Sequence, residues 1–546
     1  MDEGAMFQDI EVLHWNKEFK YTQVVERQKV VWSVNVGPQF GQYRQPVCDV
    51  IALAEGPTST RGKVNVLTVV VREYFCVRSP EVLDCQLGLG YNSVAPPEGK
   101  RPRHISKFAF VLKRFCLPVN AKGQRPTLRN PIVHESRPIS SGDPLPGPSK
   151  LSRAEEEAVL SALLTQRPTL QVDMLSASAA VKEGENFMSV VTKIDVTGHD
   201  LANGDIVSET LIMKSLPQSA ERCATFHCDA ASINEANFYS KVLTPLTALT
   251  KLPFPGCLLA TEDLLLLRHL GKDGFIMADR RKGLDLSHCQ LVLQELGRFH
   301  AASLALKHQK PDEIVKISAL VNEIFINKDN VIFNPCVDSC IDMALKAAAD
   351  LNSPVVHLLR TFYGRGFHVI SPHIAPSEPL AVVCHGDLWS NNMLFHYSKE
   401  NPETPDRVCF LDQQGWRYAS PSLDILYFLF TSGRVGMVRQ HFDDLISTYH
   451  QSLMNELEKL APSAPEVSLN DIKEEIRRHA VYGLIMSLMS LPVVTAEDIV
   501  FKPDEITEEV MQSQEYADEI ARGFLNQRFV RKVNEIFQIF CEEGFL

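Results

Sequence analysis

The stretch VVCHGDLWSNNMLF, from Val382 to Phe395, places a histidine, an aspartate and two asparagines between two apolar runs. The apolar runs predict two short buried strands, and the polar residues predict a loop held between them. In this loop, His385-Gly386-Asp387 is followed by four residues and then by Asn392, which is the H-x-D-x-x-x-x-N spacing of a kinase catalytic loop. We therefore expect Asp387 to act as the catalytic aspartate on an acceptor hydroxyl and Asn392 to bind a metal ion, with His385 supporting the loop.

Phosphoryl transfer also needs a second acidic metal ligand and a lysine on the phosphates. Asp412 ends the apolar run VCFLD twenty residues after Asn392, and we expect it to be the second Mg²⁺ ligand. Lys214 lies near the end of the predicted strand ETLIMKSLP, the place of the phosphate-binding lysine in kinases. Glu235, on the next predicted helix, is its expected ion-pair partner. ATP and Mg²⁺ are the cofactors that this set predicts.

The turn before Lys214, VKEGENFMSV, contains one glycine, Gly184, where the protein-kinase loop has three. It can still present backbone N–H groups to phosphates, and Ser189 adds a hydroxyl donor. Taken singly, these residues have structural explanations: a turn, a surface ion pair, a buried histidine or a strand-end cap. The order of strand lysine, helix glutamate, catalytic loop and strand aspartate nevertheless favours a kinase-like active site.

The residues after Asp412 indicate the class of acceptor. A protein kinase has an activation loop and an A-P-E motif here, built to receive a peptide. In this chain DQQGWRYASPSLDILYFLF runs almost at once into an apolar helix, with Ser420 as the predicted N-cap and Pro421 at the first position. We therefore expect a small-molecule alcohol as acceptor. Asp424, in the first turn, either caps this helix or braces the catalytic loop by accepting backbone hydrogen bonds.

The periodicity along the chain predicts an α+β protein in several parts. Short strands are expected in 22–36 and 63–77, in an antiparallel pair within 186–217, at 264–270, and in a hairpin within 393–412. A helix is expected from about Leu151 and another over 230–246. Further helices are predicted at 285–308, 311–325, 338–364, 436–460, 470–490 and 505–543. The outline is a two-lobed protein-kinase-like fold with a small β-rich lobe and a large helical lobe.

The length of 546 residues allows two or three domains. Residues 1–130 are expected to be a β-rich segment without an assigned role, and 131–150 a linker rich in proline, glycine and serine. The small lobe is then placed at 151–270 and the helical lobe at 271–546. Residues 1–150 carry 20 Lys and Arg against 14 Asp and Glu, whereas 151–546 carry 35 against 53. Such an acidic segment repels a polyanion, so we expect no nucleic-acid partner for 151–546.

Nothing in the sequence predicts secretion or a membrane span. The start, MDEGAMFQDIEVLHW, has acids where a signal peptide has basic residues, and the apolar run Tyr482 to Val494 is shorter than a bilayer requires. The 13 scattered cysteines are interpreted as mostly reduced core thiols. We expect a cytoplasmic protein without an obligate protein partner.

Several motifs together resemble the ecdysteroid kinase-like family, also called CHK kinase-like, a relative of choline kinases and aminoglycoside phosphotransferases. They are HGDLWSNNMLF, LDQQGWRYASPSLDILYFL, GENFMSVV, LIMKSLP, INEANFY and GRFHAASLAL, and the resemblance covers about 151–546. It implies ATP- and Mg²⁺-dependent phosphorylation of a hydroxyl on a small molecule, with ecdysteroids as the family's best-known acceptors. It also implies Asp387 as the catalytic aspartate, Asn392 and Asp412 as metal ligands, and the pair Lys214 and Glu235 on the phosphates.

Two positions depart from the family pattern. The family usually has Asp-Phe-Gln where this chain has Asp412-Gln413-Gln414, and its hinge strand usually ends Glu-Asp-Leu where this chain has Arg268-His269-Leu270. These departures motivate an alternative hypothesis, a nucleotide-binding pseudokinase that acts as a scaffold or ligand-binding module. Residues 1–150 lie outside the resemblance, as a genuine extra domain or as a stretch joined by an erroneous gene model.

Overall fold

The computed structural model describes residues 150–181, 186, 188–330, 333–497 and 525–546, together with the backbone of five strands between Val12 and Arg72. By its internal contacts the chain divides into two units, Met1–His134 and Glu135–Leu546. The boundaries expected at residues 130, 150 and 270 stay predictions.

The N-terminal unit contains antiparallel strands. Three of them form a sheet of order β1-β2-β3, and two form a separate pair, β4 with β5. The predicted strand stretch 22–36 holds most of β2 and all of β3, and the stretch 63–77 holds β5. The bounds are β1 (Val12–His14), β2 (Phe19–Glu26), β3 (Lys29–Val36), β4 (Asp49–Glu55) and β5 (Val66–Arg72).

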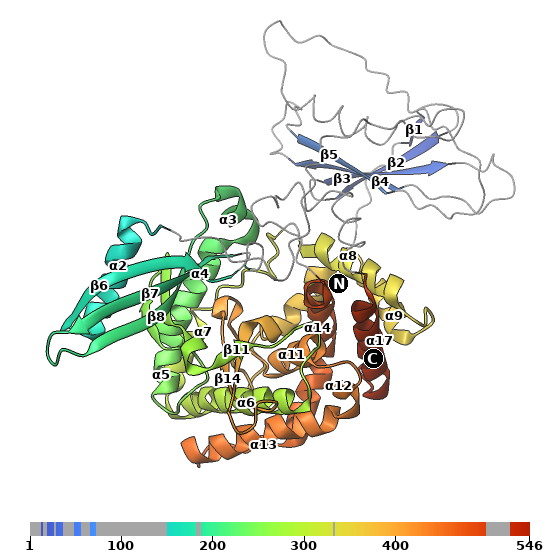
Figure 1. The fold of residues 1–546 in the computed structure, drawn as a ribbon. Helices are drawn as coiled ribbons and strands as arrows, with labels where there is room; N and C mark the ends of the chain where they lie inside the picture. The colour runs from blue at the N-terminus through green and yellow to red at the C-terminus, as the bar shows by residue number, and fades with distance from the viewer. Residues whose placement is uncertain are drawn as a thin grey trace, which may run out of the picture. The chain divides into compact units, whose positions relative to one another are not determined.

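The small lobe of the second unit is built on a five-stranded antiparallel sheet of order β6-β7-β8-β10-β9 (Figure 1). The predicted strand pair is confirmed, because β7 and β8 are antiparallel neighbours joined across the turn 201–205. Strands β6 and β9 were not predicted from the sequence. The bounds are β6 (Leu170–Ala179), β7 (Val190–Asp200), β8 (Ile206–Ser215), β9 (Cys257–Ala260) and β10 (Leu264–Arg268).

In the sequence, one α-helix directly precedes the strands of this sheet, and three α-helices lie between β8 and β9. Helix α2 (Arg153–Gln166) begins at a capping box made by Ser152 and Glu155, and it packs Val159 and Leu163 into the sheet's apolar core. The helix expected over 230–246 is interrupted by a π-helical turn at Phe238–Val242. The helices after β8 are α3 (Ala220–Phe226), α4 (Cys228–Asn237) and α5 (Leu243–Thr247).

The large lobe is mainly helical, as predicted. The expected helix 338–364 is in fact two helices: α8 ends at Ala347, the stretch 348–353 is not helical, and Pro354 begins α9, a position that proline favours. The expected helix 311–325 ends at Ser318. Only the end of the predicted helix 505–543 lies in the described residues. The bounds are α6 (Leu286–Gln309), α7 (Pro311–Ser318), α8 (Phe333–Ala347), α9 (Pro354–Arg360), α10 (Gly366–Ile370), α11 (Ser422–Ser432), α12 (Met437–Gln440), α13 (Phe442–Leu460), α14 (Leu469–Thr495) and α17 (Gln527–Glu542).

Short strands carry the polar loops of this lobe. The predicted hairpin is confirmed by β13 (Met393–Tyr397) and β14 (Pro405–Phe410), which β11 (Phe275–Met277) extends to three strands. β12 (Val382–Cys384) pairs with β15 (Arg417–Ala419).

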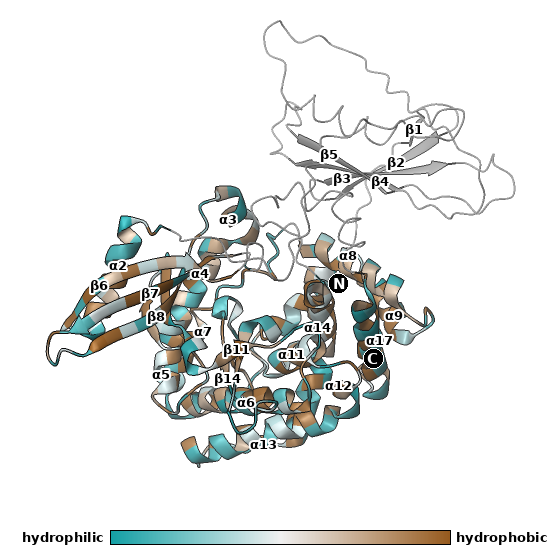
Figure 2. Cartoon of the chain, in the orientation of Figure 1, coloured by the Kyte–Doolittle hydropathy of each residue, from teal (hydrophilic) through white to brown (hydrophobic). Residues whose placement is uncertain are grey.

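Helix α11 is the centre of the large lobe. Every residue of α11 is buried, which explains why its sequence is apolar without a polar face. By contrast, the outer helix α13 alternates hydrophilic and hydrophobic residues along its length (Figure 2). In the described part of the chain, no helix combines the length and apolar character needed to cross a membrane.

Candidate active site

The quoted stretch forms a loop between β12 and β13. Both strands are buried at their loop ends, and a short 3₁₀ turn, Ser390–Asn392, closes the loop. Nδ2 of Asn392 donates to the backbone oxygen and to Oδ2 of Asp387, each at 2.9 Å. The amide oxygen of Asn392 is left to accept a cation, so the structure brings these two predicted residues together.

The loop packs directly on the segment that follows Asp412. Gly386 has φ +83°, and a Cβ at this position would lie 1.8 Å from the carbonyl oxygen of Gly415. Glycine is therefore required here both by its left-handed backbone and by the close approach. The His385 ring, which is fully buried, donates from Nε2 to the carbonyl oxygen of Leu411 at 2.8 Å. His385 thus ties the catalytic loop to the residue beside Asp412.

Asp424 braces the catalytic loop. Its carboxylate accepts hydrogen bonds from the backbone N–H groups of His385 at 2.6 Å and of Gly386 at 2.9 Å. Of the two roles that the sequence left open, the structure shows bracing. The predicted N-cap, Ser420, is wrong: the N-cap of α11 is Pro421, and the Ser420 hydroxyl instead accepts from the N–H of Ser422 at 3.3 Å.

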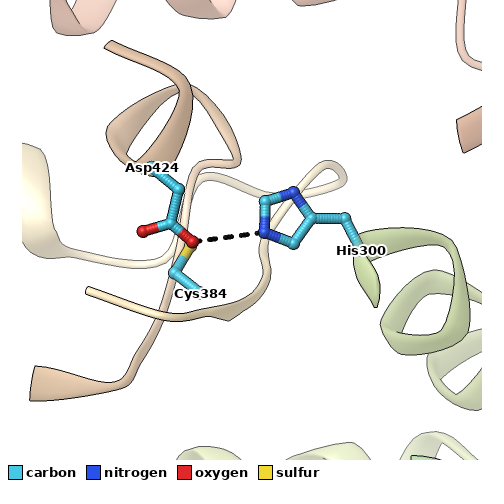
Figure 3. Close-up of side chains that lie close together, drawn as sticks. All are labelled: His300, Cys384 and Asp424. Atoms are coloured by element: carbon cyan, nitrogen blue, oxygen red, sulfur yellow. Dashed lines mark hydrogen bonds and ion pairs between the residues drawn. The ribbon is translucent and has the colours of Figure 1, made fainter. Parts of the chain in front are cut away.

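A buried histidine that the sequence analysis missed holds Asp424. Nε2 of His300 lies 3.3 Å from Oδ2 of Asp424 (Figure 3), and its Nδ1 bonds the hydroxyl of Tyr449 at 2.9 Å. Burial opposes the charge of Asp424, but the hydrogen bond and charge of His300 outweigh it and keep the pKa of Asp424 below its usual value. The signal in the sequence was weak, a histidine among the mostly small and apolar residues of FHAASLAL in α6.

Cys384 lies beside this pair, and the three groups place one potential ligand atom each within 4.8 Å of one another (Figure 3). Burial raises the pKa of the Cys384 thiol well above its usual value, which disfavours the thiolate that a metal requires. Both oxygens of Asp424 already accept hydrogen bonds. We interpret the cluster as a support of the catalytic loop.

Lys214, Glu235 and Asp412 meet in a single ion-pair network. Nζ of Lys214, from β8, lies 2.5 Å from Oε2 of Glu235 on α4 and 2.9 Å from Oδ1 of Asp412. Burial alone would lower the pKa of Lys214, but the charges of Asp412 and Glu235 hold it above its usual value. The lysine is therefore charged, and it lies between one carboxylate of the small lobe, Glu235, and one of the large lobe, Asp412.

The carboxyl of Asp387 is poised between protonation states. Burial, together with the charge of Asp412, raises its pKa to about 7. The Tyr427 hydroxyl donates to its Oδ1 at 2.9 Å and also lies 2.7 Å from Oγ of Ser490. The sequence analysis missed Tyr427 and Ser490, although Tyr427 is three residues after Asp424 in an otherwise apolar stretch.

The predicted phosphate turn is only partly described. Gly184 lies outside the described residues. Ser189 is buried, and its hydroxyl contacts Oδ1 of Asn186 at 3.3 Å. It lines a small cavity of about 10 Å³ together with Lys214, Glu235 and Gln414. The structure thus places Ser189 beside the predicted phosphate-binding lysine.

The two positions that depart from the family pattern have different surroundings. Gln413 is fully buried; its amide nitrogen lies 3.4 Å from Nε2 of His385, and its Oε1 has no hydrogen-bond partner among the described residues. Arg268 at the hinge points to the surface, where it bonds Gln166 at 3.0 Å and Glu209 at 3.4 Å. Gln413 therefore lies against a residue of the catalytic loop, His385, whereas Arg268 bonds residues of α2 and β8.

The arrangement fits a phosphate–metal group. Asn392 has an unused amide oxygen, Asp412 has a carboxylate next to a lysine, and oxygen ligands are what Mg²⁺ prefers. A cationic Lys214 supplies the charge that polyphosphate requires. The donor set is consistent with ATP and Mg²⁺ without adding any residue to those predicted.

Comparisons with solved structures give low similarity. The streptomycin–ATP–APH(2″)-IIa ternary complex is 12% identical, with 64% of this chain and 99% of that chain covered at a TM-score of 0.27. The ADP-bound aminoglycoside phosphotransferase APH(2″)-Ib is 12% identical, with 68% and 98% covered at 0.31. Glucosamine kinase in complex with glucosamine, ADP and inorganic phosphate is 12% identical, with 72% and 86% covered at 0.23. Similarity at this level identifies no substrate for this chain.

A search of curated proteins found no match. The family model of the ecdysteroid kinase-like family, by contrast, matches residues 183–461, about half of the chain. The matched range contains Lys214, Glu235, Asp387, Asn392 and Asp412. This chain belongs to the ecdysteroid kinase-like family.

Proposed function

We propose that the protein transfers the γ-phosphoryl group of ATP, with Mg²⁺, to a hydroxyl of a small molecule, an ecdysteroid-like or other small alcohol. The observation that carries the proposal is that two bonded groups adjoin. Lys214 bonds Asp412 and Glu235, and Asn392 bonds Asp387. The N–H of Leu411 donates to the backbone oxygen of Asn392 at 2.9 Å. Residues up to nearly two hundred positions apart are thus brought together, and they are of the types that phosphoryl transfer requires.

Asp387 is proposed to receive the acceptor's proton. The acceptor oxygen attacks the γ-phosphorus, the bond to the β-phosphate oxygen breaks, ADP leaves, and the hydroxyl proton passes to the Asp387 carboxylate. A pKa of about 7 suits this task, because about half of the carboxyl groups are ionised at neutral pH and such a carboxylate accepts a proton readily. Asn392 and Tyr427 hold the carboxylate in place from opposite sides.

Asn392 and Asp412 are the proposed Mg²⁺ ligands, and Lys214 is the proposed phosphate contact. When bound, the metal neutralises charge on the phosphates. Glu235 bonds the Lys214 ammonium, and both residues line the small cavity that Ser189 also lines. Gly184, in the turn before Ser189, is proposed to offer its backbone N–H group to a phosphate.

A small acceptor is supported by the segment after Asp412. Residues 413–432 are buried without exception, and the segment passes through one 3₁₀ turn and β15 into α11. A peptide substrate needs an exposed platform at this point. Because the segment is part of the core, it has no surface to offer a peptide.

The test is ATP consumption with Mg²⁺ over a panel of steroid, choline-like and glycoside alcohols. Asp387→Ala should abolish turnover, whereas Asp312→Ala, a change at an exposed aspartate on α7, should not alter it. If no acceptor gives turnover above that of the Asp387→Ala protein, the proposal is wrong.

A second candidate function, a nucleotide-binding pseudokinase, is favoured by Gln413, a buried amide where the family usually has an aromatic residue. It predicts a thermal shift with ATP and Mg²⁺ but no phosphate transfer. Transfer to any acceptor eliminates it. A cytoplasmic location and the absence of an obligate protein partner stay predictions.

A further inference from the structure

A second hollow of the large lobe, which we call the basic pocket, is lined by cationic side chains. Its volume is about 40 Å³, and none of the lining residues that the structure describes is acidic. This is unexpected in 151–546, where acids outnumber bases by 53 to 35. The cationic members are Arg280, Arg281, Lys282, Arg434, Arg528 and Lys532.

Four separate elements bring these side chains together. The turn 280–283 between β11 and α6 contributes three of them, and Arg434 follows α11. Helix α17 contributes Arg528 and Lys532, which are four residues apart and therefore on one helix face. The end of α14 lies beside α17 and completes the wall (Figure 1).

Lys532 is the central observation. It is 5% exposed, and its ammonium makes no hydrogen bond to any described residue. Its nearest carboxylate oxygen, Oε2 of Glu535, is 3.8 Å away, while the other oxygen of Glu535 accepts from the N–H of Gly436 at 2.7 Å. An ammonium has three donors to satisfy, and a buried charge without acceptors is costly. Burial accordingly lowers the pKa of Lys532.

Arg280 covers the carbonyl oxygens at the carboxyl end of α14, which would otherwise repel an anion. The carboxyl end of a helix carries a partial negative charge, and α14 ends at this pocket. Nη1 of Arg280 donates to the carbonyl oxygens of Val493 at 2.8 Å, Val494 at 2.9 Å and Ala496 at 2.8 Å. The helix end is thereby covered by a guanidinium.

Ion pairs with residues that the structure describes account for only part of the positive charge. Arg281 pairs with Asp279, and Arg528 pairs with Glu497. Lys282 and Arg434 are exposed and form no ion pair with the described residues. Among the described residues, the cationic side chains that line the hollow therefore outnumber the carboxylates that pair with them.

The basic pocket is close to the candidate catalytic residues. Tyr427 and Ser490 contact each other beside Asp387, and the next turns of their helices carry Thr431 and Val494, which line the pocket. One turn of helix is about 5.4 Å. The N–H of Ser390 in the catalytic loop also donates to Oγ of Ser432, at 2.9 Å.

We propose that the basic pocket binds an oxyanion of phosphate or sulfate size, with Lys532 as its buried donor and Lys282 and Arg434 as its exposed ones. The cavity volume suits a single tetrahedral group. Two sources share this chemistry: an ester group carried by the acceptor, and a free inorganic anion. The proposal concerns binding and does not depend on turnover.

The test is the affinity of the full chain for inorganic sulfate by calorimetry, with a non-hydrolysable ATP analogue and Mg²⁺ saturating the nucleotide site. We expect Lys532→Met to weaken sulfate binding at least tenfold and Arg434→Gln to weaken it severalfold. Lys346→Gln, a change at an exposed lysine on α8, should leave it unchanged. Because Arg434 is exposed, its variant keeps the test valid if Lys532→Met does not fold.

The proposal is overturned if the wild-type protein does not bind sulfate. It is also overturned if both pocket variants bind sulfate with the affinity of the wild type. Turnover then distinguishes the two sources of the anion. It is measured on pairs of alcohols, of which one member carries a sulfate ester and the other does not. If the acceptor supplies the anion, the sulfated member has the lower KM and inorganic sulfate competes with it. If the anion is free, sulfate changes the rate on neutral alcohols without competing. Failure of all turnover would contradict the proposed function but leave the binding result intact.

Discussion

The hydroxyl of Tyr427 donates to Oδ1 of Asp387 across 2.9 Å, and Nδ2 of Asn392 donates to Oδ2 of the same carboxylate across 2.9 Å. Asp387 is therefore held at both oxygens, one by its own loop and one by the helix at the centre of the lobe. A carboxylate fixed in this way keeps its orientation while the acceptor binds.

Tyr427→Phe should lower kcat about tenfold, equivalent to roughly 1.4 kcal/mol, because one side of Asp387 loses its support. KM for ATP should change little, since Tyr427 does not line the cavity beside Lys214. Steady-state kinetics on an acceptor from the panel measure both. Tyr418→Phe, which removes a hydrogen bond to Glu378, is the matched control. An equal loss in both variants would contradict a positioning role.

Gly386→Ala should destabilise the large lobe by about 3–5 kcal/mol, through a strained backbone and a clash with the carbonyl of Gly415. Gly415→Ala is the matched control, because its Cβ would meet its nearest atoms at 3.6 Å, an ordinary contact. Urea unfolding followed by tryptophan fluorescence reports the difference, since Trp416 is buried in this lobe. Equal stability of the two variants would refute the required close approach.

Gln413→Met should raise the free energy of unfolding by about 1–2 kcal/mol, because it removes a buried amide oxygen that has no described partner while conserving length. Gln440→Met, at an exposed position, should change stability by less than about 0.5 kcal/mol. Thermal unfolding of both variants is the measurement. A loss of stability in Gln413→Met would mean that the amide makes a favourable contact.

Stability should fall as the pH drops below about 6.5, because of a partly buried imidazole pair. Nδ1 of His373 lies 3.1 Å from Nδ1 of His479. Burial, with the neighbouring ring, lowers the pKa of His373 to about 4. Between pH 4 and 6.5 the unfolded chain binds the extra proton, so unfolding becomes easier as pH falls.

His373→Gln should remove about 1–2 kcal/mol of this loss between pH 7 and pH 5. His357→Gln, at an exposed histidine on α9, is the control. The measurement is the free energy of unfolding at each pH, compared between wild type and variants. If His373→Gln keeps the full wild-type slope, the pair is not the cause.

Deletion of residues 1–150 should leave a folded, ATP-binding protein, because the unit Glu135–Leu546 has its own sheet and helical core. Circular dichroism and a thermal shift with ATP and Mg²⁺ measure this. Aggregation of the truncated protein would count against a boundary near residue 150.

Local patterns account for what the sequence predicted well. Alternating β-branched residues around a turn predicted the β7–β8 pair, and the polar loop between apolar runs predicted the loop from β12 to β13. Residue spacing within one motif placed Asp387 next to Asn392. Each of these features depends on neighbours within about thirty residues, so the chain itself carries the signal.

The sequence did not predict contacts between residues that are distant in the chain, and it misplaced the ends of some helices. Periodicity alone predicted one continuous helix where the structure ends α8 at Ala347 and begins α9 at Pro354. The N-cap of α11 is Pro421, one residue after the predicted Ser420. Both errors concern element boundaries, which propensity determines weakly.

The sequence by itself determined the family, the two-lobed architecture and the identity of Lys214, Asp387 and Asp412 as candidates. Only the tertiary structure decided that Asp424 braces the loop through His300, that Tyr427 holds Asp387, and that Arg280 and Lys532 share one pocket. The physical reason is that these contacts join residues from 40 to more than 250 positions apart in different elements. Core packing brings them together, and no local periodicity in the sequence predicts it.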